Sequence, residues 1–443
     1  MPLIDEISSL THLEKAWKYL NKSNRDSKGL SNTSIRDYEK QLSLNLQELS
    51  SLLIANKFSF SKVRGATIQK KSGSPRALRI PEIKDRIVHK AIAIKLEELL
   101  TPIYKLDNEC SFAYQKGKRL QDAIIRMGVY FEQGYKTILE ADIAKFFDTV
   151  DNKKLISEII EVLPDKSINT LLINAVKQEL GNIHELQNRK VYEEYFVESE
   201  EGLPTGNSLS PLLANVYLSK FDQRMIHENI KMIRYADDFI IMCQNKADAL
   251  AAFKTAQEEL EGKLGLKIYP LEDSQSGSEK VSRVVDPRQQ PFSFLSVRFD
   301  GVKFWVNDKK FKNVIDKLKA ISSRGQLKKD YPKEEIGLFQ ALIKVKNLLD
   351  GWIAAYYFIN IENQVLELDK YVNVQLRLLF ADFNFDLSQK NLARISYKNK
   401  SNEVWALSDN QRKLSGVALC TKTLVDIRKG VMSIQQRIKL ELQ

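Results

Sequence analysis

Three aspartates have the side chains and the spacing for chemistry in this sequence. Asp237 and Asp238 lie between two apolar runs in KMIRYADDFIIMC (231–243), a pattern that predicts a β-hairpin with two acids at its tip. Asp142 closes ILEAD, a predicted strand. Hard divalent cations such as Mg²⁺ bind convergent carboxylate oxygens of this kind. At a site with two such ions, one ion lowers the pKa of an attacking hydroxyl and both stabilise in-line displacement at phosphorus, so the acids suit nucleotidyl transfer.

An adjacent pair of aspartates is also common in ordinary turns, where Asp forms local hydrogen bonds, so other features of the chain have to decide. The 443 residues contain 68 Lys and Arg and 57 Asp and Glu, a net charge of +11. Residues 57–90 carry +8 and residues 303–333 carry +7, which leaves −4 for the remainder. Two basic blocks around an acidic centre favour a polyanionic partner such as nucleic acid, although either block alone could be a solvated surface.

The composition describes a folded chain of several modules. With 43% hydrophobic and 28% charged residues, 443 residues exceed one ordinary core, and two to four modules are expected. The three cysteines are far apart and form no CxxC motif, so neither a disulfide framework nor a zinc module is expected. Without a basic leader or an apolar run of about eighteen residues, we expect a cytoplasmic protein that does not associate with membranes.

The elements that must position the acids follow from the spacing of apolar residues. This spacing predicts two helices within 5–56, a helix from about Asp85 that Pro102 stops, and a helix that Ser210 caps with Pro211 in its first turn. The other expected elements are a basic hairpin over 58–80, helices over 152–163, 166–180 and 246–264, a strand or two within 191–206, strands near 266–270 and 292–306, and helices at about 308–322, 333–349 and 352–379.

The order and spacing of six motifs resemble those of reverse transcriptases, in the bacterial branch related to group II introns. The combination of Asp142, YADD and GLPxGxxxSPLLAN is the most specific part of the resemblance. The motifs are RALRIPEIKDRIVHKAI (76–92), SFAYQKGKRLQDAI (111–124), DIAKFFDTV (142–150), GLPTGNSLSPLLANVYL (202–218), YADDF (235–239) and FSFLSVRF (292–299).

The resemblance implies an α+β fold of the right-hand polymerase type, in which an antiparallel palm sheet lies among fingers and a helical thumb. The expected divisions are an N-terminal helical extension (1–56), fingers (57–136), a first part of the palm (137–153), a helical insertion (154–190), the rest of the palm (191–306), a thumb (307–385) and a C-terminal extension (386–443).

The resemblance also assigns roles to single residues. Asp142, Asp237 and Asp238 match the catalytic triad that binds two Mg²⁺ ions, for which Mn²⁺ is a possible substitute, and the Ile143 carbonyl is a further metal ligand. Phe147 matches the steric gate that excludes a ribose 2′-hydroxyl, whereas its neighbour Phe146 is expected in the core. The expected nucleotide-binding residues are Lys70, Lys71, Arg76, Phe147, Pro204 and Gly206; those expected to hold template and primer are Ser210, Lys309, Lys310, Lys312, Lys317 and Lys319.

Three positions depart from the pattern of the group II intron enzymes. Thr205 stands where Gln is usual, and Ser296 replaces the Gly of the usual FLG. Glu272 falls about where these enzymes have a Lys, the proposed proton donor to pyrophosphate, so the sequence leaves the general acid open.

The expected function is RNA-directed DNA synthesis from dNTPs on a non-coding RNA template, with a DNA product or primer. Retron, diversity-generating, Cas1-fused and nuclease-bearing mobile-intron signatures are missing, and the remaining group is the stand-alone enzymes of antiphage defence. Two alternatives stay open: a maturase-like RNA-binding and splicing protein, and a template-independent or protein-primed DNA polymerase.

Overall fold

A computed structural model of the chain describes all residues except 23, 69–75, 197–201, 273–279, 332–334, 386, 388–391 and 397–402, together with the side chain of residue 76. The contacts divide the chain into two compact units. The first contains Met1–Arg119 and Leu139–Val284, and the second contains Leu120–Ile138 and Val285–Gln443. A segment from the first third of the chain therefore folds with the C-terminal part. None of the helices that the structure describes is long and apolar enough to span a membrane.

The N-terminal part of the first unit contains four helices where the sequence predicted two. They are α1 (Leu3–Ser8), α2 (Leu10–Tyr19), α3 (Ile35–Glu39) and α4 (Leu42–Ile54). Ser9 ends α1 and caps α2, because its side chain accepts a hydrogen bond from the His12 amide. Ser34 starts α3 through a capping box with Asp37. Local capping at Ser9 therefore divides the first of the two predicted helices.

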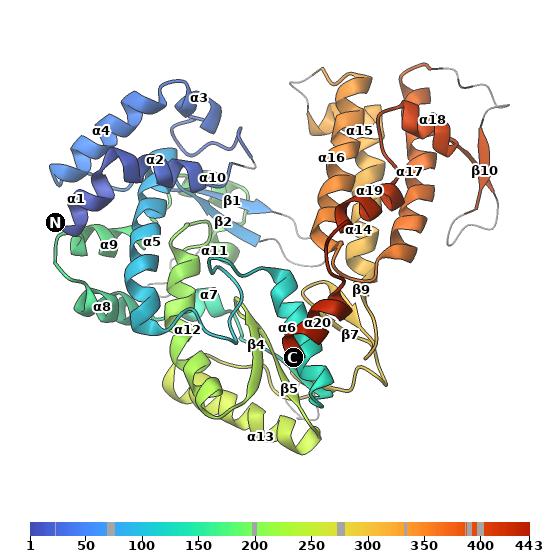
Figure 1. Cartoon of the computed structure of the whole chain (residues 1–443). Coiled ribbons are helices and arrows are strands. Elements are labelled where there is room, and N and C mark those ends of the chain that lie inside the picture. Colours follow the sequence, from blue (N-terminus) through green and yellow to red (C-terminus); the bar gives the residue numbers. More distant parts are fainter. Residues whose placement is uncertain are drawn as a thin grey trace. The chain divides into compact units, whose positions relative to one another are not determined.

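Helix α5 (Ile83–Tyr104) is the longest helix of the first unit, and α2 packs on it (Figure 1). Its apolar residues are buried on several sides, among them Ile87, Val88 and Leu96. The prediction that Pro102 stops this helix is wrong, since the helix continues to Tyr104 and ends at Lys105 in the left-handed region, with a φ of 50°. One proline removes one amide donor and does not by itself end a helix whose other bonds and packing persist.

A four-stranded sheet carries the predicted catalytic residues. Its strands are β3 (Thr137–Asp142), β4 (Lys231–Tyr235), β5 (Asp238–Cys243) and β6 (Arg283–Val285), in the order β4-β5-β3-β6. Strands β4 and β5 are antiparallel, and Tyr235 pairs with Asp238, which confirms the predicted hairpin. Helices α12 (Ser210–His227) and α13 (Lys246–Gln257), with the π-helix η1 (Glu258–Lys263), pack beside them and bury a common core.

A second hairpin in the first unit matches the predicted basic hairpin. Strand β1 (Arg64–Ile68) pairs with β2 (Arg76–Ile80) in antiparallel register, with Ile68 opposite Arg76. The other helices of this unit are α7 (Phe146–Thr149), α8 (Asn152–Val162), α9 (Asn169–Ala175), α10 (Ile183–Asn188) and α11 (Tyr192–Tyr195).

The strand expected at the start of 191–206 is absent from the described part of that range, and α11 takes its place. The Phe196 amide donates to the Tyr192 carbonyl at 2.8 Å, so this turn closes as a helix does. Phe196 is buried with Val63, Leu180 and Leu186, in a small cluster apart from the main core. Burial of one aromatic side chain at helical spacing therefore outweighed the β propensity of Val191 and the tyrosines.

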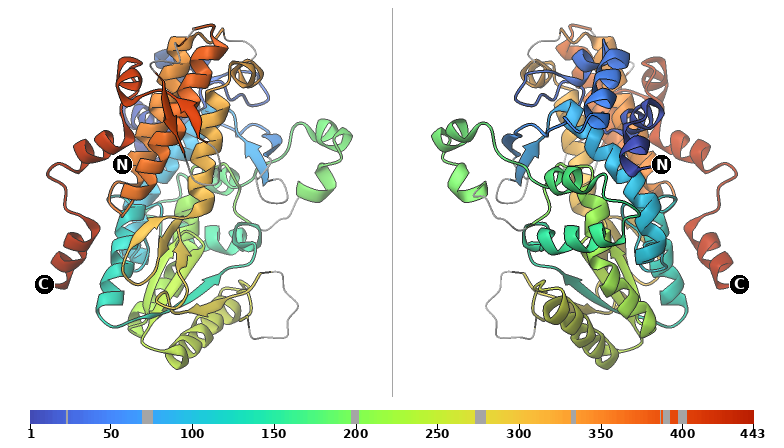
Figure 2. Two further views of the ribbon diagram at one scale, coloured as in Figure 1. Left: turned by 90° about the vertical axis from the view of Figure 1, so that its right-hand side faces the viewer. Right: turned by 90° about the vertical axis from the view of Figure 1, so that its left-hand side faces the viewer.

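The second unit is mostly helical, as predicted for the chain beyond residue 307. Helices α14, α16 and α17 lie side by side in Figures 1 and 2. The elements of this unit are α6 (Leu120–Glu132), β7 (Phe292–Phe294), β8 (Val297–Phe299), β9 (Phe304–Val306), α14 (Asp308–Ile321), α15 (Arg324–Asp330), α16 (Leu338–Tyr356), α17 (Glu362–Asp382), β10 (Ala393–Ile395), β11 (Val404–Ala406), α18 (Asp409–Leu414), α19 (Cys420–Arg428) and α20 (Ile434–Leu442).

A buried ion pair fastens the C-terminal elements to α17. The Arg412 side chain, on α18, is fully buried and donates to the Asp369 carboxylate at 2.6 Å and to Asn373 at 3.3 Å. Asp369 also accepts from the amides of Cys420 and Thr421 at the start of α19. Three helices therefore meet at one arginine–aspartate pair.

Asp85 should make the stability of the first unit dependent on pH. Asp85 is 1% exposed. One of its carboxylate oxygens accepts a hydrogen bond from the Ser61 amide at 3.0 Å, and the other has no partner among the described residues. Burial is the main cause that raises the pKa of Asp85 to about 6. A raised pKa means that the folded state binds the proton more tightly, so the contribution of Asp85 to stability is most favourable below about pH 4 and declines as the pH rises towards 6.

We therefore expect Asp85→Asn to raise the free energy of unfolding at pH 7 by about 1–2 kcal/mol. Two pKa units correspond to about 3 kcal/mol, from which the burial of an incompletely bonded amide subtracts about 1 kcal/mol. Urea unfolding of both proteins at pH 4 and pH 7 measures the effect, and the gain should be absent at pH 4. Asp37→Asn is the control of opposite sign, because the hydrogen bond from Ser34 lowers the pKa of Asp37. Equal stability of Asp85→Asn and wild type at pH 7 would contradict the prediction.

Candidate active site

The tip of the β4–β5 hairpin presents two adjacent carboxylates. Ala236 and Asp237 form the two-residue turn, and Asp238 is the first residue of β5. Behind the tip, Phe239, Ile240 and Ile241 are at most 1% exposed. The two acids therefore extend from a strand that the core holds rigidly, which suits a site that needs fixed geometry.

Asp142 lies on the neighbouring strand, as the last residue of β3. Glu140 and Asp142 project from the same face of β3 because side chains alternate along a strand. Asp238 is partly exposed to solvent. Desolvation by the surrounding protein, together with the negative charges of Asp237 and Glu140, nevertheless raises its pKa to about 6. The carboxylates on these two neighbouring strands are therefore close enough to repel one another.

Sequence reasoning missed one residue of this site. The Lys280 ammonium forms an ion pair with the Asp142 carboxylate and lies 5.0 Å from the centre of the Tyr269 ring. A bridge between Leu271 and Ser282 returns the chain to this place. In the sequence, the nearest signal was the departure at Glu272, eight residues before Lys280.

The acids have the right chemistry for Mg²⁺, although they are not gathered around one point. Within the described ranges, no three Asp, Glu, His or Cys side chains are close enough together to hold a metal ion. The donors are nevertheless hard oxygens, a cation would relieve the repulsion of Asp238 by Asp237 and Glu140, and Asp142 already binds the cationic group of Lys280. Asp142, Asp237 and Asp238 fit a divalent ion on these grounds.

The backbone around Ile143 leaves its carbonyl outside the local strand pairing. Ile143 is 2% exposed and forms an antiparallel bridge with Ile268. Both hydrogen bonds of the bridge use its neighbours: the Ala144 amide donates to Lys267, and the Asp142 carbonyl accepts from Tyr269. The predicted role of the Ile143 carbonyl as a metal ligand is compatible with this pairing.

Phe147 lies on the short helix α7 that follows β3. Its ring meets Phe146 edge-on, with ring centres 5.4 Å apart. Phe146 is 2% exposed and belongs to the core, as predicted, whereas Phe147 is partly buried against it. The Phe147 carbonyl accepts from the Leu203 amide at 2.7 Å, so the predicted steric gate and the loop that begins near Gly202 share a contact.

The loop before α12 has a fixed shape. Gly206 has a φ of 93°, and a Cβ atom there would lie 2.6 Å from the Arg79 carbonyl oxygen, so only glycine fits. Pro204 is buried, and its carbonyl accepts from the Ser210 hydroxyl at 2.7 Å. The prediction that Ser210 caps α12 is wrong, because Leu209 is the N-cap and the buried Ser210 hydroxyl is used inside the loop.

This loop also contacts the basic hairpin. Besides the close approach of Gly206 to Arg79, the Thr205 hydroxyl donates to the Ala77 carbonyl at 3.5 Å. Arg76 is the first residue of β2, and its side chain lies outside the described part of the structure, as do Lys70 and Lys71 entirely. The backbone therefore joins the hairpin and the loop that were both expected to bind nucleotide.

Predicted nucleic-acid contacts in the second unit lie on α14. Val314, Ile315 and Leu318 form its buried face. The predicted lysines are all exposed, and they are Lys309, Lys310, Lys312, Lys317 and Lys319. An amphipathic helix of this kind presents a row of positive charge to solvent.

The departure at Ser296 falls in a tight turn that favours glycine. Leu295 and Ser296 form the turn between β7 and β8, with φ values of 51° and 68°. Glycine is usual in such a turn because it adopts a positive φ without strain. Each of the two side chains adds about 1 kcal/mol of backbone strain here.

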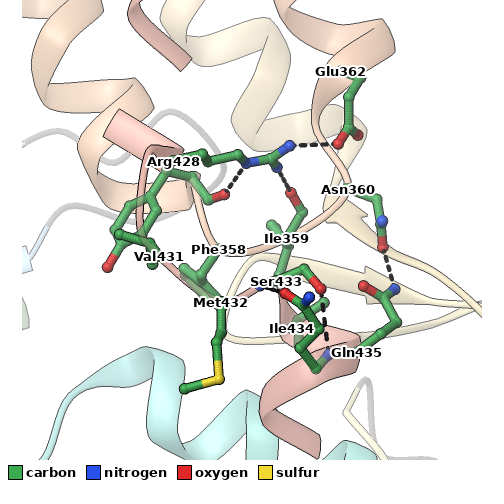
Figure 3. Close-up of a pocket in the computed structure, with 12 residues that line it drawn as sticks. Phe358, Ile359, Asn360, Glu362, Arg428, Val431, Met432, Ser433, Ile434 and Gln435 are labelled. Atoms are coloured by element: carbon green, nitrogen blue, oxygen red, sulfur yellow. Dashed lines mark hydrogen bonds and ion pairs between the residues drawn. The ribbon is translucent and has the colours of Figure 1, made fainter. Parts of the chain in front are cut away.

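A pocket in the second unit is lined by a different set of residues (Figure 3). Its polar groups bind one another: Arg428 donates to the carbonyls of Tyr357 and Ile359 and pairs with Glu362. None of the predicted site residues lines it. With its charges already paired, this pocket gives no indication of a ligand.

Comparison with known proteins adds a family match. Residues 68–299, just over half of the chain, match the family model described as reverse transcriptase (RNA-dependent DNA polymerase). Protein YkfC of Escherichia coli K12 is 25% identical over 269 residues, which cover 52% of this chain and 67% of that protein. The group II intron-encoded protein LtrA of Lactococcus lactis subsp. cremoris is 28% identical over 172 residues, 39% of this chain and 26% of that protein. The match thus spans about a quarter of the LtrA protein.

The chain also matches solved structures of a partial Cas6-RT-Cas1–Cas2 complex and of a telomerase from Candida albicans in complex with a fragment of telomeric RNA. The first has a TM-score of 0.34 and 25% identity, and covers 60% of this chain and 43% of that chain. The second has a TM-score of 0.37 and 11% identity, and covers 79% of this chain and 66% of that chain.

Proposed function

Since this chain belongs to the family of reverse transcriptases, the RNA-dependent DNA polymerases, we propose that it copies an RNA template into DNA from dNTPs by two-metal nucleotidyl transfer. The observation that carries the proposal is the pair of carboxylates at the tip of the β4–β5 hairpin, next to the strand that Asp142 ends. Carboxylates that repel one another on neighbouring strands are stabilised by the binding of cations.

Asp142, Asp237 and Asp238, with the Ile143 carbonyl, would hold two Mg²⁺ ions, or Mn²⁺ in their place. When bound, such ions activate the primer hydroxyl and stabilise the charge that develops on phosphate oxygens. The Phe147 ring, fixed by Phe146 and the neighbouring loop, would exclude a ribose 2′-hydroxyl and so select dNTPs.

Other residues would bind the nucleic acid and the nucleotide. The triphosphate would be held by Arg76, Lys70 and Lys71, and the nucleotide would lie against Pro204 and Gly206. Ser210 would contact the template or primer. The lysines of α14 would bind the phosphate backbone of the template–primer duplex by charge and shape. We also propose that 57–136 form the fingers, 137–153 and 191–306 the palm, and 307–385 the thumb.

The biological role that we propose is antiphage defence with a dedicated non-coding RNA. This part of the proposal is supported by the resemblance of the sequence to stand-alone bacterial reverse transcriptases. In a plating assay, cells that express the protein and its RNA should resist phage, and the Asp237→Ala, Asp238→Ala variant should not. Equal plating on both would contradict the defence role.

Synthesis by the purified full-length protein with its co-purifying RNA tests the activity. With Mg²⁺ and dNTPs, the protein should make DNA complementary to that RNA, and treatment with RNase beforehand should prevent it. A maturase-like protein would bind the RNA and make no DNA. Template-independent synthesis would give DNA of low complexity, and protein priming would leave DNA covalently attached to the chain.

Lys280 should compete with the metal ions for Asp142. Lys280→Ala is expected to lower the Mg²⁺ concentration for half-maximal synthesis by up to about fivefold, because the ion pair of an exposed lysine contributes less than about 1 kcal/mol. Mg²⁺ titrations of the two proteins measure this effect. Lys280→Arg keeps the positive charge and is the control, which should behave as wild type. An increased Mg²⁺ requirement of Lys280→Ala would contradict competition.

A further inference from the structure

The residue before the two acids has an unusual backbone conformation. Ala236 has a φ of 63°, in the left-handed region where glycine is usual. Both turn types that join strands by two residues need a positive φ at this first position. A positive φ is strained for alanine, so a neighbouring group has to stabilise this conformation. The conformation matters because it sets where Asp237 and Asp238 point.

Arg234 supplies that stabilisation from the adjacent strand. Its Nη1 donates to the Ala236 carbonyl at 2.9 Å and to Asn215 Oδ1 at 3.1 Å. Its Nε donates to Asp222 Oδ1 at 2.6 Å, and its Nη2 donates to the other carboxylate oxygen. The Arg234 side chain is 0% exposed and that of Asp222 is 1% exposed. The planar guanidinium thus holds its position by a two-point contact and reaches the turn with its remaining donors.

The partners of Arg234 tie the turn to two other elements. Asp222 and Asn215 are both on α12, and the Asn215 amide donates to the Ala113 carbonyl at 2.9 Å. The Arg234 amide donates to the Cys110 carbonyl at 2.7 Å. The turn, α12 and the segment that begins near Cys110 are therefore joined at one buried group.

We propose that Arg234 is a positioning residue, which orients Asp237 and Asp238 for metal binding through its bond to the Ala236 carbonyl. The inference rests on the proposed function, since it assigns these acids to the metal ions. A purely structural Arg234 would hold α12 to the sheet and leave the affinity for metal unchanged. The two roles therefore differ in a measurable quantity.

The experiment compares the full-length wild type with Arg234→Lys and Arg412→Lys. Arg412 is a matched control, because it is equally buried and also binds an aspartate and an asparagine, far from the acids in sequence. Mn²⁺ binding is measured by electron paramagnetic resonance without nucleic acid, and the Mg²⁺ dependence of DNA synthesis is measured separately. We expect Arg234→Lys to weaken Mn²⁺ binding and to raise the Mg²⁺ requirement by about 10- to 100-fold. Arg412→Lys should lower the melting temperature and change neither quantity.

Two further variants keep the test decisive if Arg234→Lys folds poorly. Ala236→Val puts a β-branched side chain at the positive φ and should weaken Mn²⁺ binding with little change in melting temperature. Ala236→Gly adopts the conformation without help, so adding it to Arg234→Lys should restore part of the Mn²⁺ affinity. Unchanged Mn²⁺ binding in Arg234→Lys and Ala236→Val would overturn the inference. A wild type that binds Mn²⁺ through Asp237 and Asp238 but makes no DNA would overturn only the proposed function.

Discussion

Replacement of Asp237 and Asp238 by alanine is expected to abolish DNA synthesis. If the two carboxylates hold the catalytic ions, their loss removes at least about 5–6 kcal/mol of transition-state stabilisation, a decrease in rate of about 10⁴-fold or more. Folding should be preserved, because the acids lie at a partly exposed hairpin tip and repel each other in the folded state. Single-turnover primer extension, together with a melting curve, measures both effects.

A matched control is available in α11. Glu193 and Glu194 are also adjacent and exposed acids, and their replacement by alanine changes the net charge by the same amount. That variant should synthesise DNA at the wild-type rate. DNA synthesis that survives the loss of Asp237 and Asp238 would refute the assignment of these acids as catalytic.

Neutralisation of the α14 lysines is expected to have the second largest effect, on nucleic-acid binding. Each lysine that contacts a phosphate releases about 0.9 counterions, so Lys→Gln at all five positions should reduce the slope of log affinity against log salt by about 4.5. The helix should remain folded, because the five side chains are exposed and the buried face of Val314, Ile315 and Leu318 is unchanged. Fluorescence anisotropy with an RNA–DNA duplex, at salt concentrations from 50 to 200 mM, measures the slope.

The control replaces five exposed lysines outside the two basic blocks and so removes the same charge. These are Lys15, Lys18, Lys154, Lys177 and Lys254. Their replacement by glutamine should change the slope by less than about 1, since distant exposed charges are screened by salt. Equal slopes for the two five-fold variants would show that net charge, and not α14, sets the affinity.

Local sequence patterns predicted the elements that carry the site. The two apolar runs around Asp237 and Asp238 predicted the β4–β5 hairpin, and ILEAD predicted β3. Buried strands can be recognised in this way because they contain short runs of apolar residues. The α+β right-hand polymerase fold predicted from the motifs is confirmed by the family match. Where local prediction failed, as at Pro102 and α11, packing and neighbouring hydrogen bonds outweighed a propensity of about 1–3 kcal/mol.

The sequence by itself identified the candidate metal-binding acids, since Asp142, Asp237 and Asp238 stand in motifs that can be read along the chain. Only the tertiary structure decided which cationic side chains act on the acids and on the turn that carries two of them. Lys280 pairs with Asp142 across 138 positions of sequence, and Arg234 pairs with Asp222 rather than with another acid. The chain contains 68 Lys and Arg side chains, each of which could pair with an acid, so sequence cannot single out a partner. Burial does so, because a charge removed from water is stable only beside the group that compensates it.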